Sequence, residues 1–226
     1  METSNNNEPG TVLLAGIVGS TAYGLAGPDS DVDRLGVFAA PTLSLLGLDA
    51  PAPSRVTVQP DVTMHEAGKA ARLLLSANPT VTELLWLPTE LYERRTPLGA
   101  ELVEIRSAFL SAKRVRDAYL GYAHQQLRKL LRGNRAAKPA RHFKRLLDQG
   151  LALYTTGSLT VPLADPQSYL DFGKRVAADP EQAGSVLADA QTTFDRTRSA
   201  LPVEPDRDRV QDWLLRVRNA FWVSNS

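Results

Sequence analysis

Apolar and polar positions divide the chain into a strand-forming first part and a helical remainder. The apolar run over Thr11–Val18 predicts a buried strand, and Val32–Ala39 predicts a second one. The segment Ser54–Gln59 alternates and is β-branched, which predicts a third strand. Asp61–His65 alternates as well, and it continues or pairs with the third strand because Pro60 separates the two.

Helical spacing of apolar residues begins after His65, and this run ends at Asn78-Pro79. Thr80 and Glu83 have the spacing of a capping box, which predicts a short helix that continues through Trp86. Apolar periodicity and Gly or Pro breaks predict further helices near residues 98–107, 111–131, 139–153, 168–178, 179–199 and 210–221.

These elements predict an α+β protein, with a small mixed-sheet N-terminal domain followed by an all-helical C-terminal half. The change of pattern near Pro88–Thr96 places the boundary between the two domains, which we expect at residues 1–95 and 96–226. A length of 226 residues allows either one large domain or two small ones, so it agrees with this division.

Composition narrows the possible classes of protein. The chain has no cysteine, which excludes disulfides, thiolate chemistry and zinc bound by Cys. No apolar run reaches the length that spans a bilayer, and the polar start METSNNNEPG lacks the basic-then-apolar order of a signal peptide. We therefore expect a cytoplasmic protein that does not associate with membranes.

A net charge of +1 conceals a basic segment. Between Lys113 and Arg145 the only acidic residue is Asp117. Such a local excess of cations is typical of a protein that binds a polyanion, although a solvated helix face is an equal alternative where nucleic acid is concerned. The basic residues are Lys113, Arg114, Arg116, Arg128, Lys129, Arg132, Arg135, Lys138, Arg141, Lys144 and Arg145.

The candidate chemistry lies between Gly16 and Phe38. The first predicted strand ends in Gly19-Ser20, which offers backbone N–H groups and a hydroxyl to a phosphate. If the second strand begins at Asp31, alternation points the carboxylates of Asp31 and Asp33 to one face, where a divalent cation would relieve their repulsion. The alternative is a solvated turn, because Asp, Ser, Gly and Pro all favour turns.

A third carboxylate would complete a site that uses two metal ions for nucleotidyl transfer. Asp61 is the candidate, because it leads a predicted strand and shares one face with Thr63. The alternative is that Asp61 is only a turn residue after Pro60. We treat His65 and His124 as structural, because the sequence offers neither of them a partner.

GSTAYGLAGPDSDVDRLGVF resembles the motif of the DNA polymerase β-like nucleotidyltransferase superfamily. More narrowly, GSTAYGL followed by SDVD resembles the RlaP (YcgL-type) family of nucleotidyltransferases. Three further segments are similar to that family, and the resemblance covers most of residues 11–163. They are DVTMHEAGKAARLLLSANPTVTELLW, YLGYAHQQLRKL and KPARHFKRLLDQGLALYTTGSLTVPL.

The resemblance implies a polymerase β-like palm in the first domain and a role for each matching residue. Asp31, Asp33 and Asp61 would hold Mg²⁺, with Mn²⁺ as an alternative ion, and Asp61 would act as the base or position it. The residues implied in nucleotide binding are Gly19, Ser20, Tyr23, Lys138, His142 and Arg145.

The spacing of Lys138, His142 and Arg145 agrees with that grouping. The three residues are four and three positions apart, so they share one face of a helix. Three cation-capable groups on one face favour an anion such as a triphosphate, which Arg can bind through two parallel hydrogen bonds. A solvent-facing basic stripe is the alternative.

The leading hypothesis is a Mg²⁺-dependent nucleotidyltransferase that moves NMP from an NTP to a hydroxyl of an acceptor. The basic segment favours RNA, tRNA included, as the acceptor. The first alternative is a nucleotide- or RNA-binding module without catalysis. The second is an enzyme of the toxin–antitoxin type that adds AMP to a protein. The sequence leaves open the base preference, the acceptor and the oligomeric state.

Overall fold

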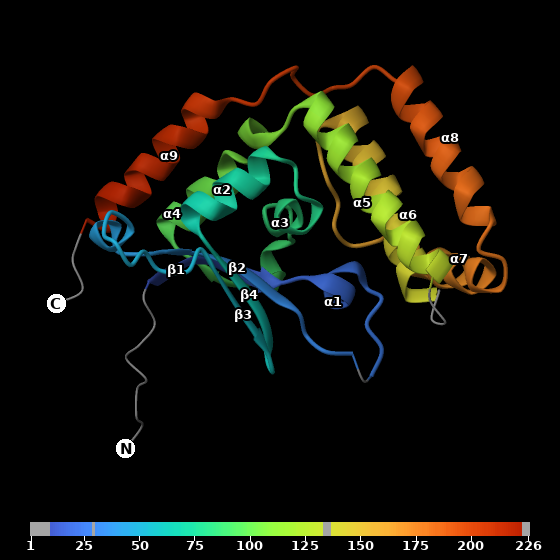
Figure 1. Ribbon diagram of the computed structural model, residues 1–226, viewed down its shortest axis with the longest axis horizontal. Helices are drawn as coiled ribbons and strands as arrows, with labels where there is room; N and C mark the ends of the chain where they lie inside the picture. Colours follow the sequence, from blue (N-terminus) through green and yellow to red (C-terminus); the bar gives the residue numbers. More distant parts are fainter. Residues whose placement is uncertain (1–9, 29, 133–136, 223–226) are drawn as a thin grey trace.

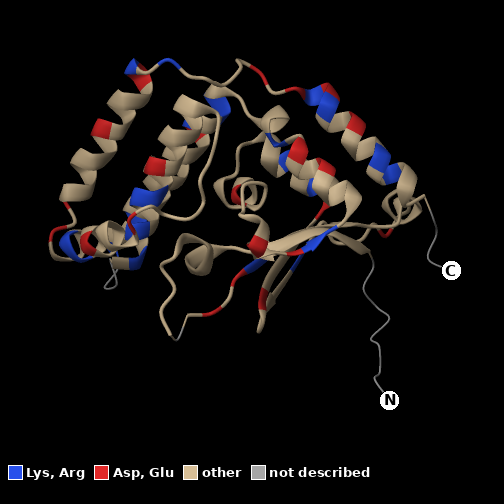
Figure 2. Ribbon diagram, turned by 180° about the vertical axis from the view of Figure 1, so that it is seen from behind, with Lys and Arg blue, Asp and Glu red and all other residues tan. Residues whose placement is uncertain are grey.

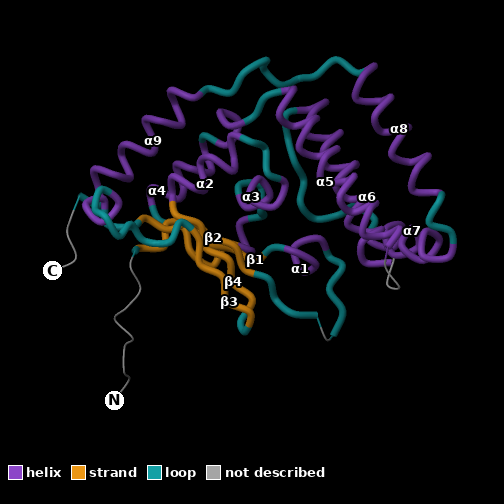
Figure 3. Tube along the Cα trace, in the orientation of Figure 1, coloured by secondary structure: helices purple, strands orange, loops and turns teal. Residues whose placement is uncertain are grey.

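The computed structural model describes residues 10–28, 30–132 and 137–222. It consists of a five-stranded sheet covered by helices, with a group of longer helices beside it (Figure 1). Strands occur only in the part that ends at Arg95, and the described chain beyond Arg95 forms helices (Figure 3). The predicted α+β class is therefore confirmed.

The sheet has the strand order β3-β4-β2-β1-β5. Strands β2 and β4 are parallel, with Arg34 beside Val62, and the other neighbouring pairs are antiparallel. The sheet is thus mixed, as predicted. The strands are β1 (Thr11–Ile17), β2 (Arg34–Ala39), β3 (Ser54–Val58), β4 (Asp61–Glu66) and β5 (Tyr92–Arg95).

Strand β5 was not predicted from the sequence. Its four residues, YERR, are mostly exposed and carry no apolar alternation, because β5 is an edge strand that pairs only with β1. The second strand begins at Arg34 rather than at Asp31. Strand alternation therefore does not orient Asp31 and Asp33, and this part of the prediction was wrong.

One face of the sheet packs against α2 (Ala67–Leu75), α3 (Pro79–Leu84) and α4 (Pro97–Glu104) (Figure 1). The central strands contribute buried apolar side chains such as Leu14 and Val37 to this core. The predicted capping box at α3 was wrong. Asn78 caps the helix by accepting a hydrogen bond from the Val81 N–H, while Glu83 is buried and binds other residues.

The longer helices form a second group. Helices α5 and α6 lie side by side, α7 packs against α6, and α8 packs against both (Figures 1 and 3). The rings of Tyr154 on α6 and Phe194 on α8 meet edge to face, with centroids 5.1 Å apart. These helices are α5 (Ala112–Arg132), α6 (Ala137–Thr156), α7 (Pro166–Ala178) and α8 (Gln182–Arg196).

The last helix, α9 (Arg207–Ala220), returns to the sheet. It packs against α2 and α4, and the Trp213 Nε1–H donates a hydrogen bond of 3.0 Å to the Leu98 carbonyl. Helix α9 therefore contacts elements on both sides of the boundary expected at residue 95, which itself stays a prediction. Within the described ranges, no helix is both long and apolar enough to cross a membrane.

Short helical segments complete the connections between these elements. Helix α1 (Gly19–Tyr23) follows β1 directly and precedes the loop that carries the aspartates. The 3-10 helices are η1 (Thr42–Leu45), η2 (Thr89–Leu91) and η3 (Arg106–Phe109).

Candidate functional site

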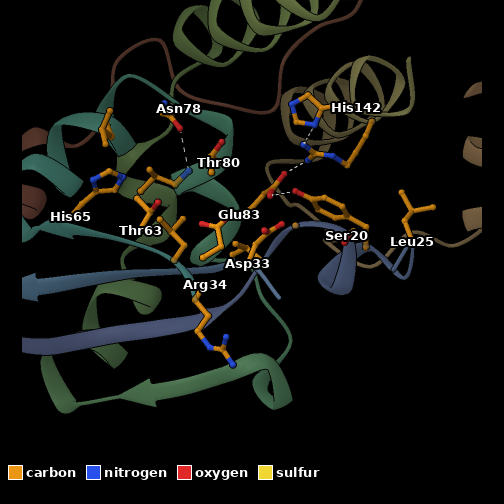
Figure 4. Close-up of a pocket in the computed structure, with 18 of the residues that line it drawn as sticks. Ser20, Leu25, Asp33, Arg34, Thr63, His65, Asn78, Thr80, Glu83 and His142 are labelled. Atoms are coloured by element: carbon orange, nitrogen blue, oxygen red, sulfur yellow. Dashed lines mark hydrogen bonds and ion pairs between the residues drawn. The ribbon is translucent and has the colours of Figure 1, made fainter. Parts of the chain in front are cut away.

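A pocket of about 730 Å³ lies where one end of the sheet meets α1, α2, α3 and α6. Its volume is in the range of small-molecule binding sites. Ten of the side chains that line it are labelled in Figure 4, where Asp33 lies near the centre. The pocket brings Asp33 and Asp61, from the sheet region, together with the basic residues of α6.

The corner between β1 and α1 is shaped by Gly19. This residue has a φ of 69°, in the left-handed region that favours glycine. A Cβ atom at this position would overlap Oδ2 of Asp33. The Val18 N–H also donates a hydrogen bond of 2.9 Å to the Asp33 carbonyl. The Gly19-Ser20 corner and Asp33 are therefore packed directly against each other.

Asp33 and Asp61 are brought together at this corner. Burial, the charge of Asp61 and a hydrogen bond between the two carboxyl groups raise the pKa of Asp33, whereas Lys138 lowers it. The charge of Asp31 adds a smaller increase to the pKa of Asp33. Asp31 itself is exposed and does not line the pocket. Asp61 and Asp31 thus both act on Asp33, although the described residues contain no group of three or more side chains that could hold a metal ion.

Strand β4 forms one wall of the pocket. Asp61, Thr63 and His65 line it, whereas Val62 and Met64 line a depression on the opposite face of the sheet. The predicted alternation of this strand is therefore confirmed, and the same alternation places His65 in the pocket. His65 Nδ1 lies 2.8 Å from Ser54 Oγ, and burial followed by the charge of Lys69 lowers the pKa of His65.

Helix α6 forms the facing wall with Lys138, Arg141, His142 and Arg145. The predicted common face of Lys138, His142 and Arg145 is confirmed by this placement. The guanidinium of Arg145 is buried, and its hydrogen bonds go to Glu83, Gln149 and His142. Lys138 and Arg141 form no ion pair within the described part of the chain, which leaves their charges available to a ligand.

A buried polar network lies beneath the pocket. Glu83 accepts hydrogen bonds from the Tyr23 hydroxyl and from the Arg145 guanidinium. Burial raises the pKa of Glu83, while Arg145 and the Tyr23 hydroxyl oppose that rise. Burial and the nearby Glu83 raise the pKa of Tyr23, so its hydroxyl stays protonated and donates. The network joins α1, α3 and α6.

His142 is neutral and has a defined tautomer. Arg145 Nη2 lies 2.8 Å from His142 Nδ1. Because a guanidinium can only donate, Nδ1 must accept, and the ring proton is on Nε2. Burial, followed by the charges of Arg145, Lys129 and Lys138, lowers the pKa of His142 to about 3. The ring is therefore a neutral donor in the wall of the pocket.

The basic segment predicted over residues 113–145 is divided among different environments. Lys113, Arg116 and Lys144 form ion pairs with Asp117, Asp195 and Asp148 respectively. Arg135 lies outside the described residues. Figure 2 shows basic positions on the ribbon of α6, across from acidic positions at the end of the sheet. Lys138 and Arg141 therefore line the pocket on α6, while Asp33 and Asp61 line it at the end of the sheet.

The structure thus places eight of the nine predicted site residues along the pocket, and Asp31 lies outside its lining. The polar atoms of Tyr23 and Arg145 face Glu83 rather than the open pocket, so their contact with a nucleotide stays a prediction. The sequence analysis did not identify Glu83, Lys69 or Arg141 as residues of the site, and it treated His65 as structural. Alternation along β4 was the available signal for His65.

Comparison with known proteins shows that the chain matches a family model. A family model described as RlaP, RNA repair pathway DNA polymerase beta family, matches residues 1–175. No curated protein matches the chain significantly. The matched range contains the pocket-lining residues of the sheet, α1, α2, α3 and α6.

Proposed function

Because this chain belongs to the RlaP family of RNA repair pathway DNA polymerase beta proteins, we propose that it is a Mg²⁺-dependent nucleotidyltransferase. The enzyme moves NMP from an NTP to a hydroxyl of an acceptor, with RNA, tRNA included, as the favoured acceptor. The single observation that supports this most is the convergence of Asp33 and Asp61 beside the Gly19-Ser20 corner.

The chemistry of these side chains fits a hard divalent cation. Asp33 and Asp61 present only oxygen ligands, and their mutual repulsion favours a positive charge between them. Mg²⁺ is usually bound by one or two carboxylates together with substrate phosphates, so this pair suffices on the protein side. Asp31 is close enough to act on Asp33 and would complete the set. When bound, the ion would neutralise negative charge on the phosphates.

The other side chains of the pocket bind and orient the NTP. Ser20 and the backbone N–H groups of the corner are suited to the phosphates, and Lys138 and Arg141 supply cationic charge from α6. The Nε2–H of His142 is a further neutral donor. Positioning of this kind provides most of the rate acceleration in phosphoryl-type transfer.

The transfer itself is a substitution at the α-phosphorus. The acceptor hydroxyl oxygen forms a bond to this phosphorus, the bond to the oxygen that bridges the α- and β-phosphates breaks, and pyrophosphate leaves. Asp61 lines the pocket beside Asp33 and is exposed, and it accepts the hydroxyl proton there. Asp33, which is packed against Gly19, has the more fixed position of the two carboxylates and would hold the metal ion.

The test is transfer of labelled NMP from each NTP to tRNA in the presence of Mg²⁺. We expect transfer by the wild-type protein and a loss of at least about 1,000-fold in Asp33→Asn and in Asp61→Asn, because each removes a charge that the transition state requires. Asp171→Asn, at a half-exposed position of α7 outside the pocket, is the control and should retain full activity.

The outcomes separate this proposal from its alternatives. No transfer with any NTP, combined with ATP binding that does not depend on Mg²⁺, would favour a binding module without catalysis. Transfer to a protein but not to RNA would favour the AMP-adding alternative. Equal activity of wild type and both aspartate variants would contradict the proposed site.

A further inference from the structure

The pocket has a second cationic end that the proposed NTP site does not use. Lys69, on the first turn of α2, lines the pocket. It forms no ion pair with any residue in the described ranges, although its charge acts on His65. An ammonium group that faces a pocket without a carboxylate partner is suited to an anionic ligand.

This end lies away from the Gly19-Ser20 corner. In Figure 4, Thr63 and His65 lie on one side of Asp33, and Ser20 and His142 lie on the other. Asp61 and His65 are four residues apart on β4, which corresponds to about 13 Å along the strand. One continuous pocket therefore has cations at both ends and the aspartates between them.

His65 has a fixed orientation next to Lys69. Its Nδ1 is paired with Ser54 Oγ at 2.8 Å, so Nε2 is the ring nitrogen left for a ligand. Thr63 and Thr80 add hydroxyl groups to the same part of the pocket wall (Figure 4). The hydroxyl groups and the ammonium are donors typical of a phosphate site, and the imidazole adds another when the Ser54 hydroxyl donates to Nδ1 and the ring proton is on Nε2.

We propose that Lys69 and His65 bind a phosphodiester of the acceptor strand, upstream of the hydroxyl that receives the NMP. This inference rests on the proposed function, because a transfer reaction needs a second substrate on the other side of the aspartates from the NTP. The NTP phosphates are assigned to the opposite end, where the Gly19-Ser20 corner, Lys138 and Arg141 lie. The Lys69 end therefore belongs to the acceptor.

The experiment measures binding of a fluorescent ribotrinucleotide with a free 3′-hydroxyl, by anisotropy, over a range of salt concentrations. Lys69→Ala should weaken binding about tenfold and reduce the slope of log K against log salt by about 0.7, the value for one lost phosphate contact on a single strand. Lys69→Arg should preserve binding. Mg²⁺–ATP affinity of Lys69→Ala should stay within about twofold of wild type, whereas Lys138→Ala should weaken it.

Lys174→Ala is the matched control, because Lys174 is a highly exposed lysine of α7 outside the pocket. Its trinucleotide affinity and salt slope should equal those of wild type. The inference is overturned if Lys69→Ala behaves like Lys174→Ala, if wild type does not bind the trinucleotide, or if Lys69→Ala loses ATP affinity as Lys138→Ala does. Inorganic phosphate that binds as tightly as the trinucleotide would also overturn it, because the ligand would then be free phosphate.

Failure of the two proposals can be distinguished. If the wild-type protein binds the trinucleotide through Lys69 but transfers no NMP, the proposed function fails while the phosphate site stands. If the wild-type protein transfers NMP and Lys69→Ala has an unchanged KM for RNA, only the phosphate site fails.

Discussion

Gly19 controls how closely the carboxylate of Asp33 approaches the corner between β1 and α1. Two independent features require glycine at this position. The backbone has a φ of 69°, and the space that a Cβ would occupy is taken by Oδ2 of Asp33. A side chain here would therefore strain the backbone and displace the aspartate at the same time.

Gly19→Ala should lower the free energy of unfolding by about 1–2 kcal/mol, the usual cost of a left-handed conformation for a residue with a Cβ. It should also weaken Mg²⁺–ATP binding at least about tenfold, because Asp33 must move. Urea denaturation and calorimetry measure the two effects. The control is Gly121→Ala, in the exposed middle of α5 with open space around its Cβ position, which should be neutral or stabilising. Wild-type behaviour of both variants would contradict the role of Gly19.

His142 links stability to pH. Its pKa is about 3 in the folded protein, whereas an unfolded histidine has a pKa of about 6.5. The unfolded state therefore binds an extra proton below that value, so the stabilisation from neutral His142 is present above pH 6.5 and is lost as the pH falls towards 3. Acid thus favours unfolding through this residue.

Between pH 7 and pH 5, His142 should account for about 2 kcal/mol of lost stability at most. His142→Gln, which can still accept a hydrogen bond from Arg145, should show a correspondingly smaller loss in urea denaturation at the two pH values. His124→Gln, at an exposed position of α5, controls for the general effect of replacing a histidine. An equal loss in wild type and His142→Gln would contradict the predicted coupling.

At the scale of elements, α9 connects the end of the chain to the sheet domain. Arg218 binds both carboxylate oxygens of Glu66, which also caps α2 by accepting a hydrogen bond from the Gly68 N–H. Thr42 donates hydrogen bonds to the carbonyls of Arg218 and Phe221. The fully buried Trp213 fills the space between α9 and α4. Helix α9 therefore stabilises α2, which carries Lys69.

Trp213→Ala should lower the free energy of unfolding by about 3–5 kcal/mol, because it leaves a large cavity and an unpaired carbonyl at Leu98. Trp222→Ala is the control, since this ring is 57% exposed and its loss should change stability by less than about 0.5 kcal/mol. Urea denaturation followed by circular dichroism measures both. Similar stability of the two variants would show that α9 does not contribute to the folded sheet domain.

At the scale of the whole molecule, one buried network connects α1 and α3, which lie beside the sheet, to α6. Glu83 on α3 and Arg145 on α6 are 62 residues apart in sequence and are both nearly inaccessible. Tyr23 on α1 adds its hydroxyl to Glu83 and its ring to the Arg145 guanidinium, whose carbon lies 4.1 Å from the ring centre. The same contacts therefore fix the two walls of the pocket relative to each other.

Glu83→Gln should lower the free energy of unfolding by about 3–5 kcal/mol, because it leaves the Arg145 charge buried without a counterion. The matched control is Glu101→Gln, which breaks the partly exposed pair with Arg216 and should cost less than about 1 kcal/mol. Urea denaturation measures both variants. Equal stability of the two would mean that the Glu83–Arg145 pair does not hold the two halves together.

Local patterns were sufficient to predict much of this architecture. Strand and helix periods follow from backbone geometry, so the apolar spacing over Thr11–Val18 and residues 111–131 located β1 and α5 to within one residue at each end. The polar edge strand β5 has no such period, and it exists because β1 offers it a partner. The sequence prediction assigned the cap of α3 to Thr80, whereas the capping residue is Asn78. Both Thr and Asn are common caps, so residue type alone does not distinguish them.

The sequence by itself determined the α+β class, the Gly19-Ser20 corner, the placement of Asp61 on the pocket face of β4 and the shared face of α6. Tertiary structure alone decided that Glu83 engages Arg145, that Asp31 lies outside the pocket lining, and that His65 and Lys69 line the same pocket as Lys138. The physical reason is the distance along the sequence over which each kind of contact acts. Backbone hydrogen bonding sets which side chains share a face within one element, whereas the partner of a polar side chain depends on elements that meet only when the chain folds.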